Sequence, residues 1–256
     1  MNLPIHLIST LKQNAIALSV MTLLFYSCTT KQGAQEIVDK AIKAHGGAIY
    51  EDVFIEFDFR DKHYTIKNKN GKYEYTRSFK DATNSIKDVL TNNSFSRHIN
   101  GRDVVLADSM VQKYSNSVNS VVYFAMTPFV LNDKAVKKKY LGICAVKGKK
   151  YHKIQVTFNQ ESGGEDFDDE FVYWFGKDDY IMDYFAYKFK TDGGGSRYRE
   201  MYNPRRVGGI LFTDHINSKY SSLDTPLAEY DQLCEDTQLS ELSRIILKNV
   251  KVTSLK

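Results

Sequence analysis

Two arginines, Arg197 and Arg199, are the charged residues most suited by type and spacing to bind an anion. Alternate residues of a strand share a face, so both guanidinium groups point the same way if this segment is a strand. A pair of guanidinium groups can hold the carboxylate or phosphate of an anionic head group. They can equally cover a solvent-facing surface, which is the simpler interpretation of the spacing.

An acidic run and several histidines are the other candidates for chemistry. The run 165–170 is rich in carboxylates but lacks the Asp-x-Asp-x-Asp-Gly order of a calcium loop, which favours a solvated hairpin. After the first 27 residues the histidines are His45, His63, His98, His152 and His215. None stands in H-x-x-x-H or H-x-H spacing, so a metal site would need distant histidines to converge. We expect no metal and no cofactor, and we interpret His152 as a half-buried, hydrogen-bonded histidine.

Established catalytic motifs are absent from the sequence. It contains no G-x-S-x-G elbow, S-x-x-K, P-loop or G-x-G-x-x-G. An enzyme would therefore have to assemble its site from distant residues, around His152 or the acidic run. The formal net charge is only +4, and basic residues are interleaved with acidic ones except in 134–139. This pattern argues against nucleic acid as a partner.

The first 27 residues have the pattern of a signal peptide. The segment 15–26 is almost continuously apolar but shorter than the roughly 20 residues that span a bilayer. The sequence Phe25-Tyr26-Ser27-Cys28 resembles a lipobox, where a signal peptidase cuts before a lipidated cysteine. We expect residues 1–27 to be removed, Cys28 to carry lipid such as palmitate, and 28–33 to be a linker. The alternative is a signal anchor with an incidental cysteine.

The residues after Cys28 bear on location. Thr29 stands where inner-membrane lipoproteins of enterobacteria carry aspartate, and the linker has no acidic run of the kind linked to surface export. Both observations favour the periplasmic face of the outer membrane, with the membrane as a partner through the lipid on Cys28.

The remaining residues, 34–256, are expected to form a single β-rich domain. Ala34, Ile37, Val38, Ala41 and Ile42 recur at helical spacing, and Gly46-Gly47 ends that helix. A second helix is expected at 109–127, with Ser109 as its N-cap, and 224–241 is expected to be irregular or helical. Alternation and turn residues predict strands at 53–60, 63–68, 72–79, 95–99, 102–106, 139–146, 151–159, 170–176, 180–190, 196–203, 210–219 and 244–252. Short turns between them indicate an antiparallel meander.

Aromatic residues occupy both faces of the later strands. Phe171, Tyr173 and Phe175 share one face, whereas Trp174 lies on the other. In the next strand, alternation sets Tyr180, Met182 and Tyr184 opposite Ile181, Phe185, Tyr187 and Phe189. A strand that is apolar on both faces must be covered on both, and any gap beneath a covering helix becomes a greasy pocket. The candidate ligand-binding residues are Tyr123, Phe124, His152, Tyr173, Trp174, Tyr184, Arg197 and Arg199. Cys144 and Cys234 are expected to be free rather than paired.

The opening helix ending in Ala44-His45-Gly46-Gly47, together with 197–203 and 207–212, resembles outer-membrane lipoprotein-sorting proteins of the LolA/LolB-like superfamily. The segment 117–125, with Tyr151-His152-Lys153-Ile154 and Tyr173-Trp174, resembles an uncharacterised Bacteroidota lipoprotein family within that group. The resemblance covers roughly 34–252. It implies an α+β fold in which a curved antiparallel β-sheet, an incomplete barrel, wraps around a few helices and binds acyl chains in its hollow. It implies no catalytic residues.

Three functions remain open at this point. The first is an envelope lipoprotein that binds a hydrophobic or amphiphilic ligand, a lipid or a lipoprotein, in the hollow of the half-barrel. The second is an envelope hydrolase with a convergent site. The third is a protein or glycan interaction module without a cavity. A cavity with an apolar lining would distinguish the first from the third.

Overall fold

The computed structural model describes residues 33–159, 169–190 and 193–256. The expected signal peptide, Cys28 and most of the acidic run, 165–168, lie outside the described residues. The helices are α2 (Ala34–His45), η2 (Gly47–Glu51), α3 (Asp108–Met126), η3 (Phe129–Asn132), η6 (Leu227–Glu229) and α4 (Tyr230–Glu235). None of these described helices is both long and apolar enough to cross a membrane.

Fourteen strands account for most of the remaining described residues. The first sheet contains β1 (Val53–Phe59), β2 (Lys62–Lys69), β3 (Lys72–Asp81), β4 (Asn84–Thr91), β5 (Phe95–Ile99), β6 (Arg102–Val104) and β14 (Leu247–Ser254). The second contains β7 (Val136–Val146), β8 (Lys149–Phe158), β9 (Glu170–Gly176), β10 (Met182–Phe189), β11 (Gly195–Val207), β12 (Ile210–Lys219) and β13 (Ser240–Ile245). We call them sheet A and sheet B.

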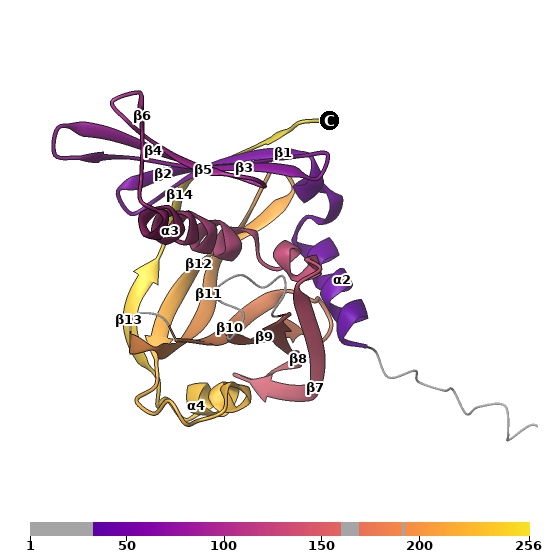
Figure 1. The fold of residues 1–256 in the computed structure, drawn as a ribbon. Helices are drawn as coiled ribbons and strands as arrows, with labels where there is room; N and C mark the ends of the chain where they lie inside the picture. The colour runs from indigo at the N-terminus through magenta and orange to yellow at the C-terminus, as the bar shows by residue number, and fades with distance from the viewer. Residues whose placement is uncertain (1–32, 160–168, 191–192) are drawn as a thin grey trace, which may run out of the picture. The chain divides into compact units, whose positions relative to one another are not determined.

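Both sheets are antiparallel and are joined through consecutive strands. Sheet A runs in the order β14-β1-β2-β3-β4-β5-β6, and sheet B in the order β13-β12-β11-β10-β9-β8-β7. The chain passes from β13 in sheet B to β14 in sheet A through the single residue Ile246. At the opposite ends, α3 leads from edge strand β6 to edge strand β7 (Figure 1). This is the expected incomplete antiparallel barrel around a few helices, here divided into two hydrogen-bonded sheets.

Helix α3 lies between the two sheets and packs on both (Figure 1). Its buried Val122 and Met126 join a core cluster with Ile55 and Ile66 of sheet A. Half a turn away, Phe124 packs against Phe185 of sheet B, with ring centroids 5.5 Å apart. Because apolar side chains on both sides of α3 pack against a sheet, they fix the distance of the helix from each sheet. The position of α3 therefore sets the depth of any pocket beneath it.

An ion cluster fixes α3 to sheet A. Asp88 on β4 is fully buried and accepts hydrogen bonds from both Arg77 on β3 and Arg97 on β5. Arg77 also donates to the Ser117 hydroxyl on α3 at 2.6 Å. The guanidinium of Arg97 stacks over Tyr114 of the same helix, 3.4 Å from the ring centroid. The two arginines therefore connect the sheet to one face of α3.

The two faces of sheet B are covered by different elements, as the aromatic pattern predicted. On the inner face, Ile37 and Ala41 of α2 pack in one cluster with Tyr173 and Phe175. On the outer face, Trp174 packs in a separate cluster with residues of η6 and α4. The alternation of β9 therefore assigns each of its aromatic residues to the correct face.

Four details of the predicted elements are corrected by the structure. Helix α3 begins one residue earlier, with Ala107 and not Ser109 at the N-cap position. Strand β4 was missed, because its sequence Asn84–Thr91 alternates only weakly. The single last strand predicted at 244–252 is two strands, β13 and β14, in different sheets. A register shift between Met182 and Tyr184 puts Met182 in the same inner cluster as Phe185, although simple alternation placed them on opposite faces.

Candidate functional site

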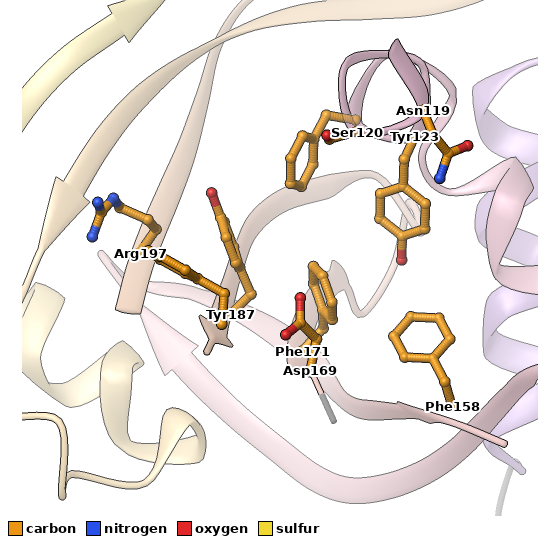
Figure 2. Close-up of a pocket in the computed structure, with 10 residues that line it drawn as sticks. Asn119, Ser120, Tyr123, Phe158, Asp169, Phe171, Tyr187 and Arg197 are labelled. Carbon is orange, nitrogen blue, oxygen red and sulfur yellow. The ribbon is translucent and has the colours of Figure 1, made fainter. Parts of the chain in front are cut away.

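A pocket of about 340 Å³ lies between α3 and the inner face of sheet B. We call it the aromatic pocket, because six aromatic side chains line it: Tyr123, Phe124, Phe158, Phe171, Tyr187 and Phe189. Figure 2 shows the ring of Tyr123 descending from α3 toward Phe158, Phe171 and Tyr187, which rise from the strands. The remaining lining residues are Asn119, Ser120, Asp169 and Arg197. Aromatic rings and polar groups therefore share the wall of this pocket.

The aromatic wall is held rigidly by contacts among its own members. The Tyr123 and Tyr173 hydroxyls share a hydrogen bond of 2.9 Å, which links α3 to β9 beneath the pocket. Burial raises the pKa of both phenols above the ordinary value, so they stay neutral. Phe171 stacks on Tyr187 with centroids 5.3 Å apart. A preformed apolar wall of this kind loses little side-chain entropy when a ligand fills it.

A second, smaller pocket of about 200 Å³ adjoins the first. Ser120 and Phe124 of α3 line both pockets, so the two pockets adjoin at these residues. We call the second the arginine pocket, after Arg199. Its other lining residues are Phe59, Arg60, Val121, Ala125, His215, Asn217, Ser243, Ile245 and Leu247. The described residues that line it therefore include no carboxylate.

Arg199 is buried with most of its hydrogen-bonding capacity unused. Arg199 is only 7% exposed, and among the described residues neither its Nε nor its Nη1 has a hydrogen-bond partner. Nη2 donates to the Tyr187 hydroxyl at 2.9 Å, and the guanidinium lies over the rings of Phe124 and Tyr187. Burial, reinforced by nearby Arg197 and Arg60, lowers the pKa of Arg199. None of the salt bridges among the described residues involves it.

Two further buried polar residues stand beside Arg199 on the neighbouring strand. Asn217 is its cross-strand partner on β12, and His215 lies two residues before Asn217 on the same face of that strand. His215 Nδ1 and Asn217 Oδ1 are buried without partners, while Asn217 Nδ2 donates to the Ser243 hydroxyl of β13. Burial, with Arg199 adding to it, lowers the pKa of His215 to about 3. The imidazole is therefore neutral at physiological pH.

The structure brings four of the eight candidate ligand-binding residues to these pockets. Tyr123 and Arg197 line the aromatic pocket, Arg199 lines the arginine pocket, and Phe124 lines both. The simpler interpretation of the arginines as solvent-facing is wrong for Arg199, which is buried, whereas Arg197 is half-buried and stacks over Phe189. Strand alternation was correct, but it could not say which face was covered.

The other four candidates lie elsewhere. Tyr173 is buried below the aromatic pocket, and Trp174 and Tyr184 belong to the cluster on the outer face of sheet B. His152 is buried on the inner face near α2, stacked on Tyr180 and within hydrogen-bonding distance of the Tyr140 hydroxyl at 3.3 Å. Its expected role as a hydrogen-bonded histidine agrees with this geometry, although it is more buried than expected.

Several pocket residues were not identified from the sequence. Asn119 and Ser120 lie one helical turn before Tyr123 and Phe124, so helical periodicity could have found them. Alternation placed Tyr187 and Phe189 on the face of Phe185, but neither was included among the candidate ligand-binding residues. His215, Asn217 and Ser243 meet Arg199 only through the pairing of three strands, and no local pattern reveals that.

Neither a metal centre nor a disulfide is formed by the residues that the structure describes. They contain no group of three or more His, Cys, Asp or Glu side chains placed to hold a metal ion. Cys144 and Cys234 are free and half-buried. Burial raises the pKa of both thiols, which makes them poor nucleophiles. A solid core with no internal cavity would have favoured the interaction-module hypothesis; the structure instead has two partly open pockets beside α3.

Comparison with solved structures places the fold. A LolA superfamily protein from Nitrosomonas europaea superposes with a TM-score of 0.51 and 11% identity, over 88% of this chain and 95% of that chain. A domain described as an outer membrane lipoprotein-sorting protein, from Vibrio parahaemolyticus, gives 0.45 and 10% identity, over 86% and 92%. A DUF1329 family protein from Desulfovibrio piger gives 0.42 and 10% identity, over 86% and 93%. The first of these shows that the fold is LolA-like.

Comparison of sequences identifies the family. No curated protein matches the chain. A family model described as "Family of unknown function (DUF6503)" matches residues 14–246, which is most of the chain. The chain therefore belongs to the DUF6503 family.

Proposed function

We propose that this protein is a cell-envelope lipoprotein that binds the acyl chain of a hydrophobic or amphiphilic ligand between α3 and sheet B. The observation that carries the proposal is the aromatic pocket, in which six rings from α3, β8, β9 and β10 face one hollow. The LolA-like fold supports it, because a half-barrel leaves such a hollow between sheet and helix. The proposed role is binding rather than catalysis.

The size and lining of the pocket suit such a ligand. Ligand pockets span roughly 300–1,000 Å³, and their walls are mainly apolar with a few polar groups that set orientation. At about 340 Å³ the aromatic pocket is large enough for part of an acyl chain, and the arginine pocket extends it by about 200 Å³. Each methylene transferred from water contributes roughly 0.8 kcal/mol, so several together account for a stable complex.

The proposal is tested with hexadecanol that carries a photoactivatable diazirine on its chain. We expect the full chain, in a mild non-ionic detergent, to be labelled saturably and in competition with unlabelled hexadecanol. Labelled peptides should map to α3 around 119–124 and to β10 around 187–189, because these segments line the aromatic pocket. Labelling that does not saturate, or that is scattered over peptides remote from α3 and sheet B, would show that the hollow is not a ligand site.

The anchor at Cys28 is part of the same proposal. A lipid on Cys28 and a linker of a few residues would keep the pocket near a membrane, where acyl ligands are supplied, and the periplasmic face of the outer membrane is the proposed location. Stable membrane attachment takes two signals, such as two acyl chains or one acyl chain with a polybasic patch.

The Cys28→Ser variant should lose incorporation of labelled palmitate and accumulate unprocessed or mislocalised, because no thiol remains to receive the lipid. The measurement is metabolic labelling with palmitate followed by membrane fractionation. Cys144→Ser is the matched control, since it removes a thiol that is half-buried in β7 and should leave labelling unchanged. A Cys28→Ser protein that is still labelled and still sediments with membranes would refute the anchor.

A further inference from the structure

The arginine pocket contains buried polar groups that the fold itself does not use. Among the described residues, the Nε and Nη1 of Arg199, the Nδ1 of His215 and the Oδ1 of Asn217 all lack hydrogen-bond partners. Buried polar groups in native proteins are nearly always paired, and an unpaired buried cation is the most costly case. Three such residues around one hollow mark a place where a ligand completes the bonding.

Interactions within the protein compensate only part of the burial of Arg199. The ring faces of Phe124 and Tyr187 attract the guanidinium, and the Tyr187 hydroxyl accepts one of its hydrogen bonds. Asp214, the carboxylate that acts on the neighbouring His215, is engaged by Arg205 and Asn203. Arg60 and Arg197 add further positive charge nearby. The electrostatic potential in the pocket therefore favours an anion.

The two pockets are arranged to take the two ends of one molecule. Both are lined by Ser120 and Phe124, so the two pockets adjoin at these residues of α3. Tyr187 connects them as well, because its ring lines the aromatic pocket while its hydroxyl accepts a hydrogen bond from Arg199. The apolar and cationic regions thus adjoin in the order that an anionic amphiphile requires.

We propose that the arginine pocket binds the anionic head group, carboxylate or phosphate, of an amphiphile whose acyl chain lies in the aromatic pocket. The proposal rests on the proposed function and names its ligand class. Arg199 donates to the head group through Nε and Nη1, and the neutral His215 contributes Nδ1–H in the tautomer that donates there. Turning the Asn217 amide by half a turn lets the Ser243 hydroxyl donate to Oδ1 and directs the amide N–H toward the head group.

The test compares three sixteen-carbon ligands with different head groups as competitors of the labelled hexadecanol: hexadecanoate, hexadecyl phosphate and hexadecanol. On the wild-type full chain we expect at least one anion to compete about tenfold or more better than the alcohol, as a charge-assisted hydrogen bond provides. Arg199→Met should remove this preference, so that neither anion competes better than hexadecanol on that variant. Lys219→Met removes the same charge from the exposed end of β12 and should keep the preference.

Asn217→Asp provides a second variant in case Arg199→Met does not fold. It places a carboxylate on the cross-strand partner of Arg199, where it pairs with the guanidinium and should abolish the preference for anions. A preference for hexadecanoate alone identifies a free fatty acid, and one for hexadecyl phosphate alone identifies a phosphate-bearing lipid. Equal competition by all three ligands on the wild type overturns the head-group site while leaving the acyl pocket intact. Failure of hexadecanol itself to label would instead overturn the proposed function.

Discussion

Asp88→Ala should lower the free energy of unfolding by about 3–5 kcal/mol, the largest stability effect that we expect from any single substitution in this protein. Asp88 is fully buried and accepts hydrogen bonds from two arginines that are themselves buried. Its removal leaves both guanidinium groups in the interior without an anion. Urea unfolding of the full chain, followed by far-ultraviolet circular dichroism, measures the difference.

Two comparisons make this result specific. Asp103→Ala breaks an exposed pair with His98 and should cost less than about 1 kcal/mol. Replacing the whole cluster by apolar residues, Arg77→Met with Asp88→Leu and Arg97→Met, should recover much of the loss, because no unpaired charge remains buried. If Asp88→Ala unfolds at the same urea concentration as wild type, the cluster does not hold α3 on sheet A.

Ser120→Trp should weaken binding of the labelled hexadecanol by more than tenfold, because the indole fills the junction of the two pockets. Excluding only two methylenes from the pocket removes roughly 1.6 kcal/mol of burial, which already exceeds a factor of ten in affinity. Ser120 is exposed, and its hydroxyl bonds only to the Asn116 carbonyl one turn earlier, so the fold should tolerate the change. Saturation labelling gives the affinity.

Lys113→Trp is the matched control for this substitution. Lys113 is exposed on the same helix but lines neither pocket, so the added indole should leave the affinity at the wild-type value. The free energy of unfolding of both variants, measured by thermal unfolding, should differ from that of the wild type by no more than about 0.5 kcal/mol, as is usual at exposed positions. Wild-type affinity in a folded Ser120→Trp protein would place the ligand elsewhere.

The sequence was most informative where structure depends on local pattern. The helix Ala34–His45 was predicted with its observed bounds, because apolar spacing and the glycines after it act within a few residues. The faces of Phe171, Tyr173 and Trp174 were also correct, since alternation along an unbroken strand has a fixed period. At Met182 a register shift broke that period, and the predicted face was wrong.

The candidate site was less accessible to prediction for a physical reason. Arg199, Asn217 and Ser243 lie side by side only because β11, β12 and β13 pair in one register. That register is decided by packing of the whole sheet and not by the residues between the strands. Aromatic content indicated that a greasy hollow would form, but the position of its cationic end depended on contacts between distant segments.

The crossing from β13 to β14 has a consequence for how the chain folds. Strand β1, the first strand of sheet A in the chain, pairs on one side with β14, so Val53 lies opposite Ser254. Until β14 has been synthesised and has paired, β1 presents an open hydrogen-bonding edge, which is a template for aggregation. Pairing between strands so distant in the chain also slows folding, because the long intervening loop must close before its contacts form. Sheet A therefore cannot be completed until long after its first strand has been made, and β1 needs protection of that edge during this interval.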